Sequence, residues 1–244
     1  MLDMPKPTAR ISHPYGVAFE KREELPFRVR IADPKEDLNR ILELRSRAYG
    51  RHLPEMAKRL EQAEPDDLRE DALLLIAESK QTGELLGSIR LVTNVSRPLS
   101  IEHETPLPAQ FQHRHLLEAR RLTVCNGAEG RMTTPALIKA IYEVSFHCGL
   151  DVVLITARHP VDRMYRAMQF KDALDGQVLL LPDVNNVPHR LFYMEVATAD
   201  STWRAVNWPF YPFLARTWHP DIAVDFELAY QRLCQYVGEP LRVT

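Results

Sequence analysis

The sequence predicts an α/β (α+β) fold, with helices packed on a mixed β-sheet. Three observations lead to this prediction. Short apolar or alternating segments, typical of strands, are interspersed with segments of helical periodicity. Residues 73–93 have the pattern of a β-hairpin. Residues 116–156 have the order strand, helix, strand, which predicts a βαβ unit at the centre of the sheet, with a right-handed crossover.

The length of 244 residues suits one domain with terminal extensions better than two domains. We expect an irregular N-terminal arm over residues 1–25, a main domain over 26–200, and an aromatic-rich extension over 201–244 that packs on the same domain. All 3 tryptophans fall within residues 203–218, where they either line a tunnel or lid or simply pack the extension on the sheet.

The composition excludes several functional classes. A formal net charge of −2 gives no reason to expect nucleic acid as a partner. The 3 cysteines are widely spaced and form no C-x-x-C pair, which predicts free thiols and no metal site. No apolar run approaches the roughly 18 residues of a membrane span, and the N-terminus lacks the apolar core of a signal peptide. We therefore expect a cytoplasmic protein without a transmembrane segment.

The N-terminal part predicts a strand followed by two helices. Apolar and charged residues alternate over 27–32, as in a strand. Asp33 and Glu36 then have the spacing of a capping box, which predicts a helix that ends near Gly50. A second helix is expected over 55–62.

The hairpin consists of the apolar run 73–77 and a returning strand over 85–93, joined by a glycine-containing turn over 80–84. A proline-rich connecting loop is expected over 95–113, and a further strand over 116–124. Thr133-Thr134-Pro135 is expected to cap a long helix. The remaining elements follow in order: that helix over 136–147, a strand over 151–156, a short helix over 161–170, strands over 178–181 and 191–196, and a helix over 224–236.

Three short runs resemble known enzymes. Residues 71–77 and 87–93 resemble the paired strands of acyl-homoserine lactone synthases, which end in a similar G-x-x-R-L-hydrophobic-x-T run. Residues 117–124 resemble their next strand, with its E-x-x-R pattern. Over about 27–196 the element order is similar to that of the GNAT superfamily of acyltransferases, and among its members the chain most resembles the FeeM-type N-acyl amino acid synthases.

The resemblance implies a GNAT-like domain over 26–200, with a mostly antiparallel sheet and a splayed central parallel pair. It also implies an N-acyltransferase that moves a long-chain acyl group from a carrier thioester to the α-amine of an amino acid, with tyrosine as one candidate. Two alternatives stay open. One is an acyl-homoserine lactone synthase that uses S-adenosylmethionine, and the other is a catalytically silent acyl-binding module on the same scaffold.

Members of the superfamily that use acetyl-CoA carry a loop resembling [QR]-x-x-G-x-[GA], whose N–H groups cradle a pyrophosphate at a helix N-terminus. In the aligned run 131–136, Thr134 replaces the glycine and Pro135 removes an N–H donor. We therefore expect acyl carrier protein, rather than coenzyme A, as the donor and partner, with no tightly bound cofactor. The candidate contacts with its phosphopantetheine arm are Arg131, Thr133 and Thr134.

Aminolysis of a thioester requires loss of the ammonium proton of the acceptor, and Glu118 is the predicted base, acting directly or through a water. A carboxylate midway along a central strand is partly desolvated, which raises its pKa toward a useful value. The alternative is a structural ion pair between Glu118 and a nearby arginine. Arg90 and Arg121 are the predicted clamps for the acceptor carboxylate, because a guanidinium can bind a carboxylate bidentately.

In a regular strand Glu118 and Arg121 face opposite sides, so they share a pocket only if a β-bulge intervenes. The same alternation points Arg120 away from Arg121. The resemblance implies such a bulge, with a backbone N–H near Thr123 or Val124 directed at the oxyanion.

Tyr165 is the predicted acid for the departing thiolate, because the related enzymes carry a tyrosine here, although Gln169 replaces their glycine. Aromatic packing is the alternative. Arg45 and Tyr49, four residues apart on one helix face, are expected to border the acceptor. Three aspartates either meet the acceptor ammonium or form a solvated acidic face: Asp66, Asp67 and Asp71.

Overall fold

The computed structural model describes residues 19–50 and 53–235. Its main sheet has 8 strands. In order across the sheet these are β2 (Phe27–Ile31), β3 (Ala72–Ser79), β4 (Leu85–Thr93), β5 (Leu116–Val124), β6 (Val152–Arg158), β9 (Pro188–Glu195) and β7 (Lys171–Asp172), with β8 (Leu179–Leu180) also paired to β9. Every pairing is antiparallel except that of β5 with β6. The predicted mixed, mostly antiparallel sheet is therefore confirmed.

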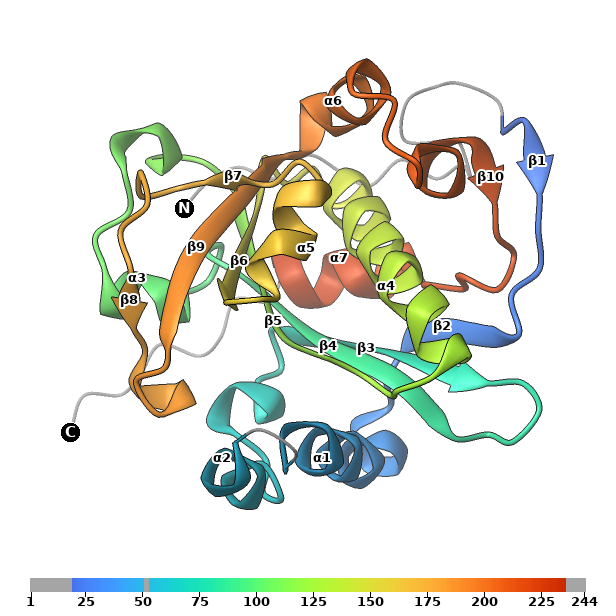
Figure 1. Ribbon diagram of the computed structural model, residues 1–244, viewed down its shortest axis with the longest axis horizontal. Helices are drawn as coiled ribbons and strands as arrows, with labels where there is room; N and C mark the ends of the chain where they lie inside the picture. Colours follow the sequence, from blue (N-terminus) through green and yellow to red (C-terminus); the bar gives the residue numbers. More distant parts are fainter. Residues whose placement is uncertain (1–18, 51–52, 236–244) are drawn as a thin grey trace.

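Helices cover both faces of this sheet (Figure 1). One face carries α1 (Pro34–Gly50), α2 (Pro54–Arg59) and α3 (Ser100–Glu104), and the other carries α4 (Ala128–His147), α5 (Asp162–Ala167), α6 (Ala199–Ala205) and α7 (Phe226–Tyr230). The alternation of β3 explains the two layers, because Leu73 and Leu75 join the core under α4 while Leu74 and Ile76 join the core under α1. Among the described helices, none has the length and apolar composition to cross a bilayer.

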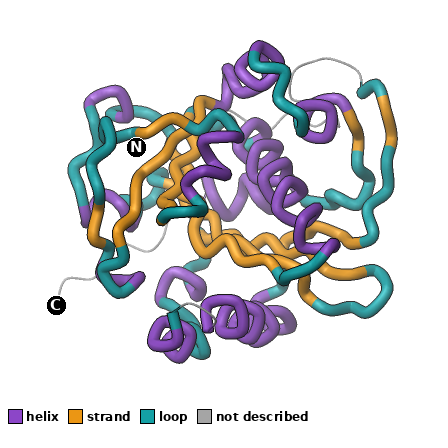
Figure 2. Tube along the Cα trace, in the orientation of Figure 1, coloured by secondary structure: helices purple, strands orange, loops and turns teal. Residues whose placement is uncertain are grey.

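The two central parallel strands separate part-way along their length. Their pairing runs only from Leu116 opposite Val152 to Ala119 opposite Ile155. Beyond that point β5 stays paired with β4 up to Val124, while β6 stays paired with β9 up to Arg158. The two halves of the sheet therefore diverge, as Figures 1 and 2 show, and the predicted splayed pair is confirmed.

The start of α1 differs from the predicted capping box. The Asp33 N–H donates to Asp37 Oδ2 at 2.9 Å, and Asp33 Oδ1 accepts from the Lys35 N–H at 2.8 Å. The returning carboxylate is therefore Asp37, and the prediction of Glu36 is wrong. Asp37 is fully buried and also binds Arg30 at 2.6 Å, so its position is fixed by the ion pair with β2 as well as by the helix.

Two predictions for the segment between β4 and α4 were wrong. The segment 95–113, predicted as a loop, contains α3 and a 3₁₀ turn at Ala109–Phe111. α4 begins at Ala128, not at residue 136, and Pro135 lies inside it. A proline at the eighth helical position removes the hydrogen bond to the Arg131 carbonyl, but the rest of the helix continues to His147.

Further single turns lie at Pro65–Leu68, Pro182–Val184, Val196–Thr198, Pro212–Arg216 and Gln231–Gln235.

The C-terminal segment packs on the sheet and on α4. β10 (Thr217–Trp218) pairs in parallel with β1 (Lys21–Arg22), the only described strand in the predicted N-terminal arm, most of which lies outside the described residues. Trp203 is 1% exposed, and its indole N–H donates to the Met168 carbonyl at 2.9 Å. Trp203 and Trp208 join the core that includes α4, and neither they nor Trp218 lines the central cavity described below. These contacts favour the packing role over a tunnel or lid.

Candidate functional site

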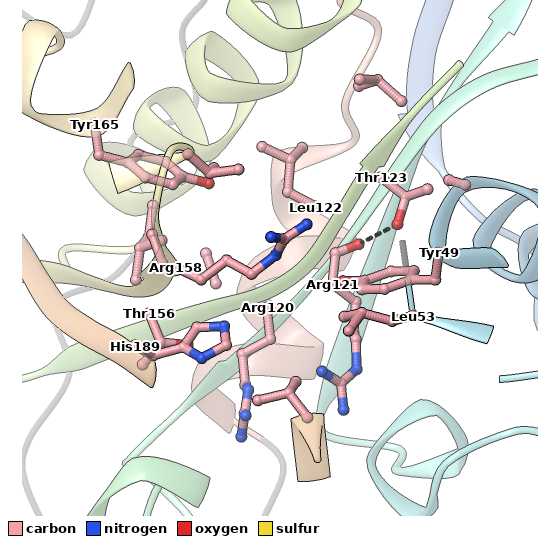
Figure 3. A pocket seen from close by; sticks show the side chains of 17 residues that line it. Tyr49, Leu53, Arg120, Arg121, Leu122, Thr123, Thr156, Arg158, Tyr165 and His189 are labelled. Atoms are coloured by element: carbon pink, nitrogen blue, oxygen red, sulfur yellow. Dashed lines mark hydrogen bonds between the residues drawn. The ribbon is translucent and has the colours of Figure 1, made fainter. Parts of the chain in front are cut away.

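A cavity of about 250 Å³ opens where β5 and β6 part (Figure 3). One wall is β5 from Ala119 to Val124, and the opposite wall is β6 from Ile155 to Arg158. The end of α1 contributes Tyr49, and Tyr165 of α5 lies on the other side of the cavity (Figure 3). Of the residues predicted to form the site, Arg121, Tyr49, Tyr165, Thr123 and Val124 line this cavity.

A β-bulge in β5 shapes the first wall. Ser88 of β4 pairs with Thr123 and Arg90 pairs with Arg120, so Arg121 and Leu122 both stand opposite the single Ile89. Arg121 has φ 58°, a left-handed conformation that is uncommon for a residue with a side chain. The Thr123 hydroxyl donates to the Arg121 carbonyl at 3.1 Å and holds the bulge closed. The β-bulge that the resemblance implies for this strand is thus present.

The bulge also places Arg120 and Arg121 on the same side of β5. Their guanidinium groups bind one carboxylate oxygen, Asp183 Oδ2, at 2.5 Å and 2.9 Å. The expectation that Arg120 points away from Arg121 is therefore wrong, because the extra residue reverses the alternation. Both side chains extend to the same part of the site in Figure 3.

Glu64 is the second carboxylate on Arg121. Arg121 Nε donates to Glu64 Oε2 at 2.7 Å, and Nη2 donates to Oε1 at 2.5 Å, which is a bidentate pair. Burial opposes ionisation of Glu64, but Arg121 and Arg90 outweigh it and lower its pKa to about 2. No sequence pattern predicts that carboxylates of the chain itself bind Arg121, because Glu64 and Asp183 are far from it along the chain.

Behind the cavity lies a buried ion cluster formed by Arg45, Asp67 and Arg90. Arg45 Nη1 donates to Asp67 Oδ2 at 2.8 Å, and both side chains are 0% exposed. Arg90 Nη1 donates to Asp67 Oδ1 at 2.9 Å. Neither Arg45 nor Arg90 lines the cavity, so in this conformation they support its wall. Asp66, Asp67 and Asp71 all carry ion pairs to arginine, which makes the prediction of a solvated acidic face wrong.

Glu118 lies deeper than predicted. It is 0% exposed and sits opposite Leu154, where β5 and β6 are still paired. Its Oε2 accepts from the Ile101 N–H of α3 at 3.4 Å, and its Oε1 lies 3.7 Å from Arg120 Nη1. Burial raises the pKa of Glu118, although Arg120 opposes this. Glu118 does not line the cavity, and the nearer Arg120 connects it to the site.

Tyr165 combines cavity lining with aromatic packing. It is 3% exposed and forms an edge-on contact with Phe170, with ring centroids 5.5 Å apart. Burial raises its pKa above the usual value of a phenol, so the hydroxyl stays protonated at neutral pH. This geometry is compatible with a proton donor to a leaving thiolate and also with the packing alternative.

The three residues predicted to contact the donor arm belong to α4. Arg131, Thr133 and Thr134 lie within the helix, and the connection from β5 to α4 is Cys125–Gly127. Thr133 is 0% exposed and faces β4, where a Cβ on Gly87 would lie 2.6 Å from its methyl group. The expected loop over 131–136 is therefore wrong. The helix N-terminus begins at Ala128, and its first N–H groups come before Pro135.

Two ionisable residues of the cavity, Arg158 and His189, were not predicted from the sequence. Arg158 is the last residue of β6. It pairs with His189, which is the second residue of β9. A single histidine after a proline has no recognisable pattern, and only the pairing of β9 with β6 brings it to the cavity. Among the described residues, no group of three or more His, Cys, Asp or Glu side chains is arranged to hold a metal ion.

Comparison with protein families gives one match. Residues 40–194 match the family described as N-acyl amino acid synthase FeeM, and they span more than half of the chain and all of the cavity-lining segments. A comparison with curated proteins found no match.

Solved structures with the same fold include two kinds of enzyme. FeeM, an N-acyl amino acid synthase from uncultured soil microbes, is 16% identical with a TM-score of 0.54, covering 71% of this chain and 92% of that one. BjaI, a CoA-dependent acyl-homoserine lactone synthase solved with SAM and isopentyl-CoA, is 16% identical with a TM-score of 0.53, covering 85% and 100%. The acyl-homoserine lactone synthase LasI is 14% identical with a TM-score of 0.52, covering 71% and 93%. At these identities the likeness establishes the GNAT-like fold.

Proposed function

The chain belongs to the family of FeeM N-acyl amino acid synthases and is an N-acyltransferase, and from this premise we propose that it joins a long-chain acyl group to the α-amine of an amino acid. The acyl group comes from a thioester, and the products are an amide and a free thiol. One observation carries the proposal. The cavity between the parted strands β5 and β6 combines an open strand edge with the guanidinium groups of Arg120 and Arg121, which share one carboxylate.

The thioester arm enters between the parted strands. Beyond Ala119 the edge of β5 toward β6 has no strand partner within the described chain, so its backbone groups are available to a pantetheine amide. The bulge supports an oxyanion site, because Thr123 and Val124 line the cavity and a backbone N–H directed at the carbonyl oxygen stabilises the tetrahedral intermediate. Tyr165 is the proposed proton donor to the thiolate.

The acceptor carboxylate binds Arg120 and Arg121 by exchange with Asp183. Asp183 has the same chemistry as an α-carboxylate, and its side chain is 33% exposed, so it can be displaced. Tyr49 supplies an aromatic wall, which favours tyrosine or another aromatic amino acid as acceptor. Arg45 and Arg90 hold this wall in place through Asp67. Glu118 reaches the acceptor only through a water, because Arg120 lies nearer the cavity.

Acyl carrier protein remains the proposed donor, and the cytoplasm the proposed location. Pro135 lies inside α4 and not at its N-terminus, so the predicted loss of an N–H donor from a pyrophosphate cradle is wrong. Both donors present the same phosphopantetheine arm to the cavity.

The test is an assay of the purified chain with long-chain acyl carrier protein or acyl-CoA and each of the common amino acids, read by mass spectrometry. We expect an N-acyl amino acid, formed faster from acyl carrier protein. Release of methylthioadenosine from S-adenosylmethionine would identify the lactone synthase instead. Donor binding without product from any acceptor would identify the silent module.

The clamp is tested by Arg121→Lys, which keeps the charge but cannot bind a carboxylate bidentately. We expect kcat/KM for the acceptor to fall about 100-fold, equivalent to about 2.7 kcal/mol, with most of the change in KM. The matched control is Arg114→Lys, since Arg114 forms a comparable bidentate pair with Glu195 and does not line the cavity. Equal, small effects of both substitutions would remove Arg121 from the acceptor site.

A further inference from the structure

We propose that His189 is the general base that removes the ammonium proton of the acceptor. The inference rests on the proposed function and adds to it a residue that the sequence did not suggest. His189 lies on β9, opposite Arg158 of β6, and lines the cavity at the side where the two strands part (Figure 3). It is 9% exposed, so its ring is held by the protein but still reaches the cavity.

The hydrogen bond of His189 defines which ring nitrogen is basic. Nδ1 lies 2.7 Å from the Val187 carbonyl oxygen. A carbonyl oxygen only accepts hydrogen bonds, so Nδ1 carries the hydrogen. In the neutral ring the lone pair is then on Nε2. The backbone of the same turn therefore selects the tautomer that a general base requires.

The surroundings keep this histidine neutral. Burial is the main cause that lowers its pKa, and the nearby cations Arg120 and Arg158 lower it further. The Val187 carbonyl and Asp183 act in the opposite direction but do not outweigh these effects. At neutral pH the ring is therefore free to take up a proton, which matches the protonation state of a base before the reaction.

The other side chains with nitrogen or phenol groups that line the cavity are poorer proton acceptors than imidazole. They are Tyr49, Arg120, Arg121, Arg158 and Tyr165. A guanidinium group has no acceptor atom, and a phenol hydroxyl is a weaker base than a neutral imidazole nitrogen. The carboxylates of Glu64 and Asp183 are paired with arginine, and that of Glu118 is completely buried. His189 lies beside Arg120 in Figure 3, and an α-amine is one carbon away from the carboxylate that Arg120 and Arg121 would bind.

The proton balance is complete with these groups. Nε2 of His189 takes one proton from the acceptor ammonium, and the resulting amine attacks the thioester carbonyl carbon. The C–N bond forms, and the carbonyl electron pair moves to oxygen. When the oxyanion collapses, the C–S bond breaks and the sulfur takes up a proton from Tyr165. The attacking nitrogen then gives its extra proton to Tyr165, which restores the phenol. His189 then releases its proton to solvent, leaving an amide and a thiol.

The substitution His189→Asn tests the role with little structural change, because the Asn amide N–H can still donate to the Val187 carbonyl while the basic nitrogen is absent. We expect kcat/KM for the acceptor to fall by about 10²- to 10⁴-fold, the usual contribution of general base catalysis. Binding of the acyl donor should be unchanged. In His189→Ala, added imidazole should restore part of the rate.

The pH profile distinguishes a base from a structural residue. In the wild type, kcat/KM should rise with pH and level off near neutrality, once His189 is unprotonated. In His189→Asn, it should keep rising until the acceptor amine deprotonates in solution. The control Arg114→Lys, at a residue that does not line the cavity, should keep the wild-type shape.

A wild-type profile without a plateau near neutrality, or a His189→Asn variant with the wild-type rate and profile, would overturn the inference while leaving the transferase intact. A wild type that forms no amide from any acceptor would instead overturn the proposed function, and this inference with it.

Discussion

The conformation of Arg121 is costly for a single residue and is stabilised by its neighbours. A left-handed φ at a residue with a side chain costs about 1–2 kcal/mol. The bond from Thr123 to the Arg121 carbonyl and the bidentate pair with Glu64 offset this cost. The strained residue is also the one that faces the cavity, so the same bonds that hold the bulge fix the direction of the guanidinium.

Asp67 is the residue on which the buried cluster depends. It binds Arg45 and Arg90 through different oxygens and also accepts from the Glu64 N–H at 3.0 Å. Burial lowers the pKa of Arg45, against the attraction of Asp67, so removal of that carboxylate leaves a buried cation without its ion-pair partner.

The substitution Asp67→Asn should therefore reduce the free energy of unfolding by about 3–5 kcal/mol, the usual cost of an uncompensated buried charge. Urea denaturation at pH 7 measures it. The control is Asp66→Asn, whose side chain is 27% exposed and whose loss should cost less than half as much. Equal costs at the two positions would show that the Arg45–Asp67 pair adds no stability of its own.

At the residue level the sequence identified part of the site. Arg121, Tyr49 and Tyr165 were predictable because they belong to recognisable local runs. Glu64, Asp183 and His189 were not, because they come to the site through tertiary contacts between segments far apart in the chain. Glu118 was identified, but its depth depends on where the pairing of β5 with β6 ends, and no local pattern encodes that point.

Among the elements, the junction of β5 with α4 is the most tightly constrained. Gly127 has φ 107°, which turns the chain from the strand into the helix. Three residues later, a Cβ on Gly130 would lie 1.9 Å from the Cys125 carbonyl oxygen. The first turn of the helix therefore packs directly on the backbone that leaves the strand.

We expect Gly130→Ala to destabilise the protein by about 2–4 kcal/mol, because a clash with a backbone atom cannot be relieved by rotating a side chain. It should also lower kcat, since the helix start moves relative to the end of β5. Thermal unfolding and the acyl-transfer assay measure the two effects. In the control Gly50→Ala, the new Cβ meets Ala57 at an ordinary 3.7 Å, and stability should change by less than about 1 kcal/mol.

The long elements were predictable and the short ones were not. The strands β3 to β6 have apolar runs or alternations that persist over seven to nine residues, so their existence is clear in the sequence. α3, α6 and β7 are too short to show a period. The start of α4 was misplaced because Thr133-Thr134-Pro135 has the composition of a helix N-terminus, although the chain is already helical there.

For the whole molecule, one buried lysine joins the C-terminal segment to α4. Lys139 is 1% exposed, and its Nζ donates to the carbonyls of Phe213 and Thr217 and to His219 Nδ1, at 3.2 Å for the last. All three donors of the ammonium are thereby satisfied. His219 must stay neutral for this contact, and burial together with Lys139 lowers its pKa to about 4.

This arrangement predicts a loss of stability in mild acid. The folded pKa of His219, about 4, lies below its value of 6.5 when exposed, so its contribution is complete above pH 6.5 and declines as the pH falls toward 4. Between pH 7.5 and 5 the wild type should lose about 1–2 kcal/mol more than His219→Gln, after allowance for solvent screening. Urea denaturation at the two pH values measures the difference.

Glu143 acts in the opposite sense and does not affect the comparison. Burial raises its pKa to about 7, against the attraction of Lys139, so protonation below pH 7 stabilises the folded chain. Because Glu143 is present in both proteins, its contribution cancels unless the His219 substitution changes its surroundings. An equal pH response of wild type and His219→Gln would contradict the predicted role of His219.

The pairing of β1 with β10 has a consequence for biosynthesis. Ribosomes deliver a polypeptide from its N-terminus, and Lys21 finds its strand partner only when Thr217 has been translated. Lys139 likewise gains its carbonyl acceptors from the last part of the chain to emerge. A nascent chain that stalls before this point therefore exposes an unpaired strand and an unsatisfied ammonium, and both are features by which quality-control chaperones and proteases can distinguish it from the finished protein.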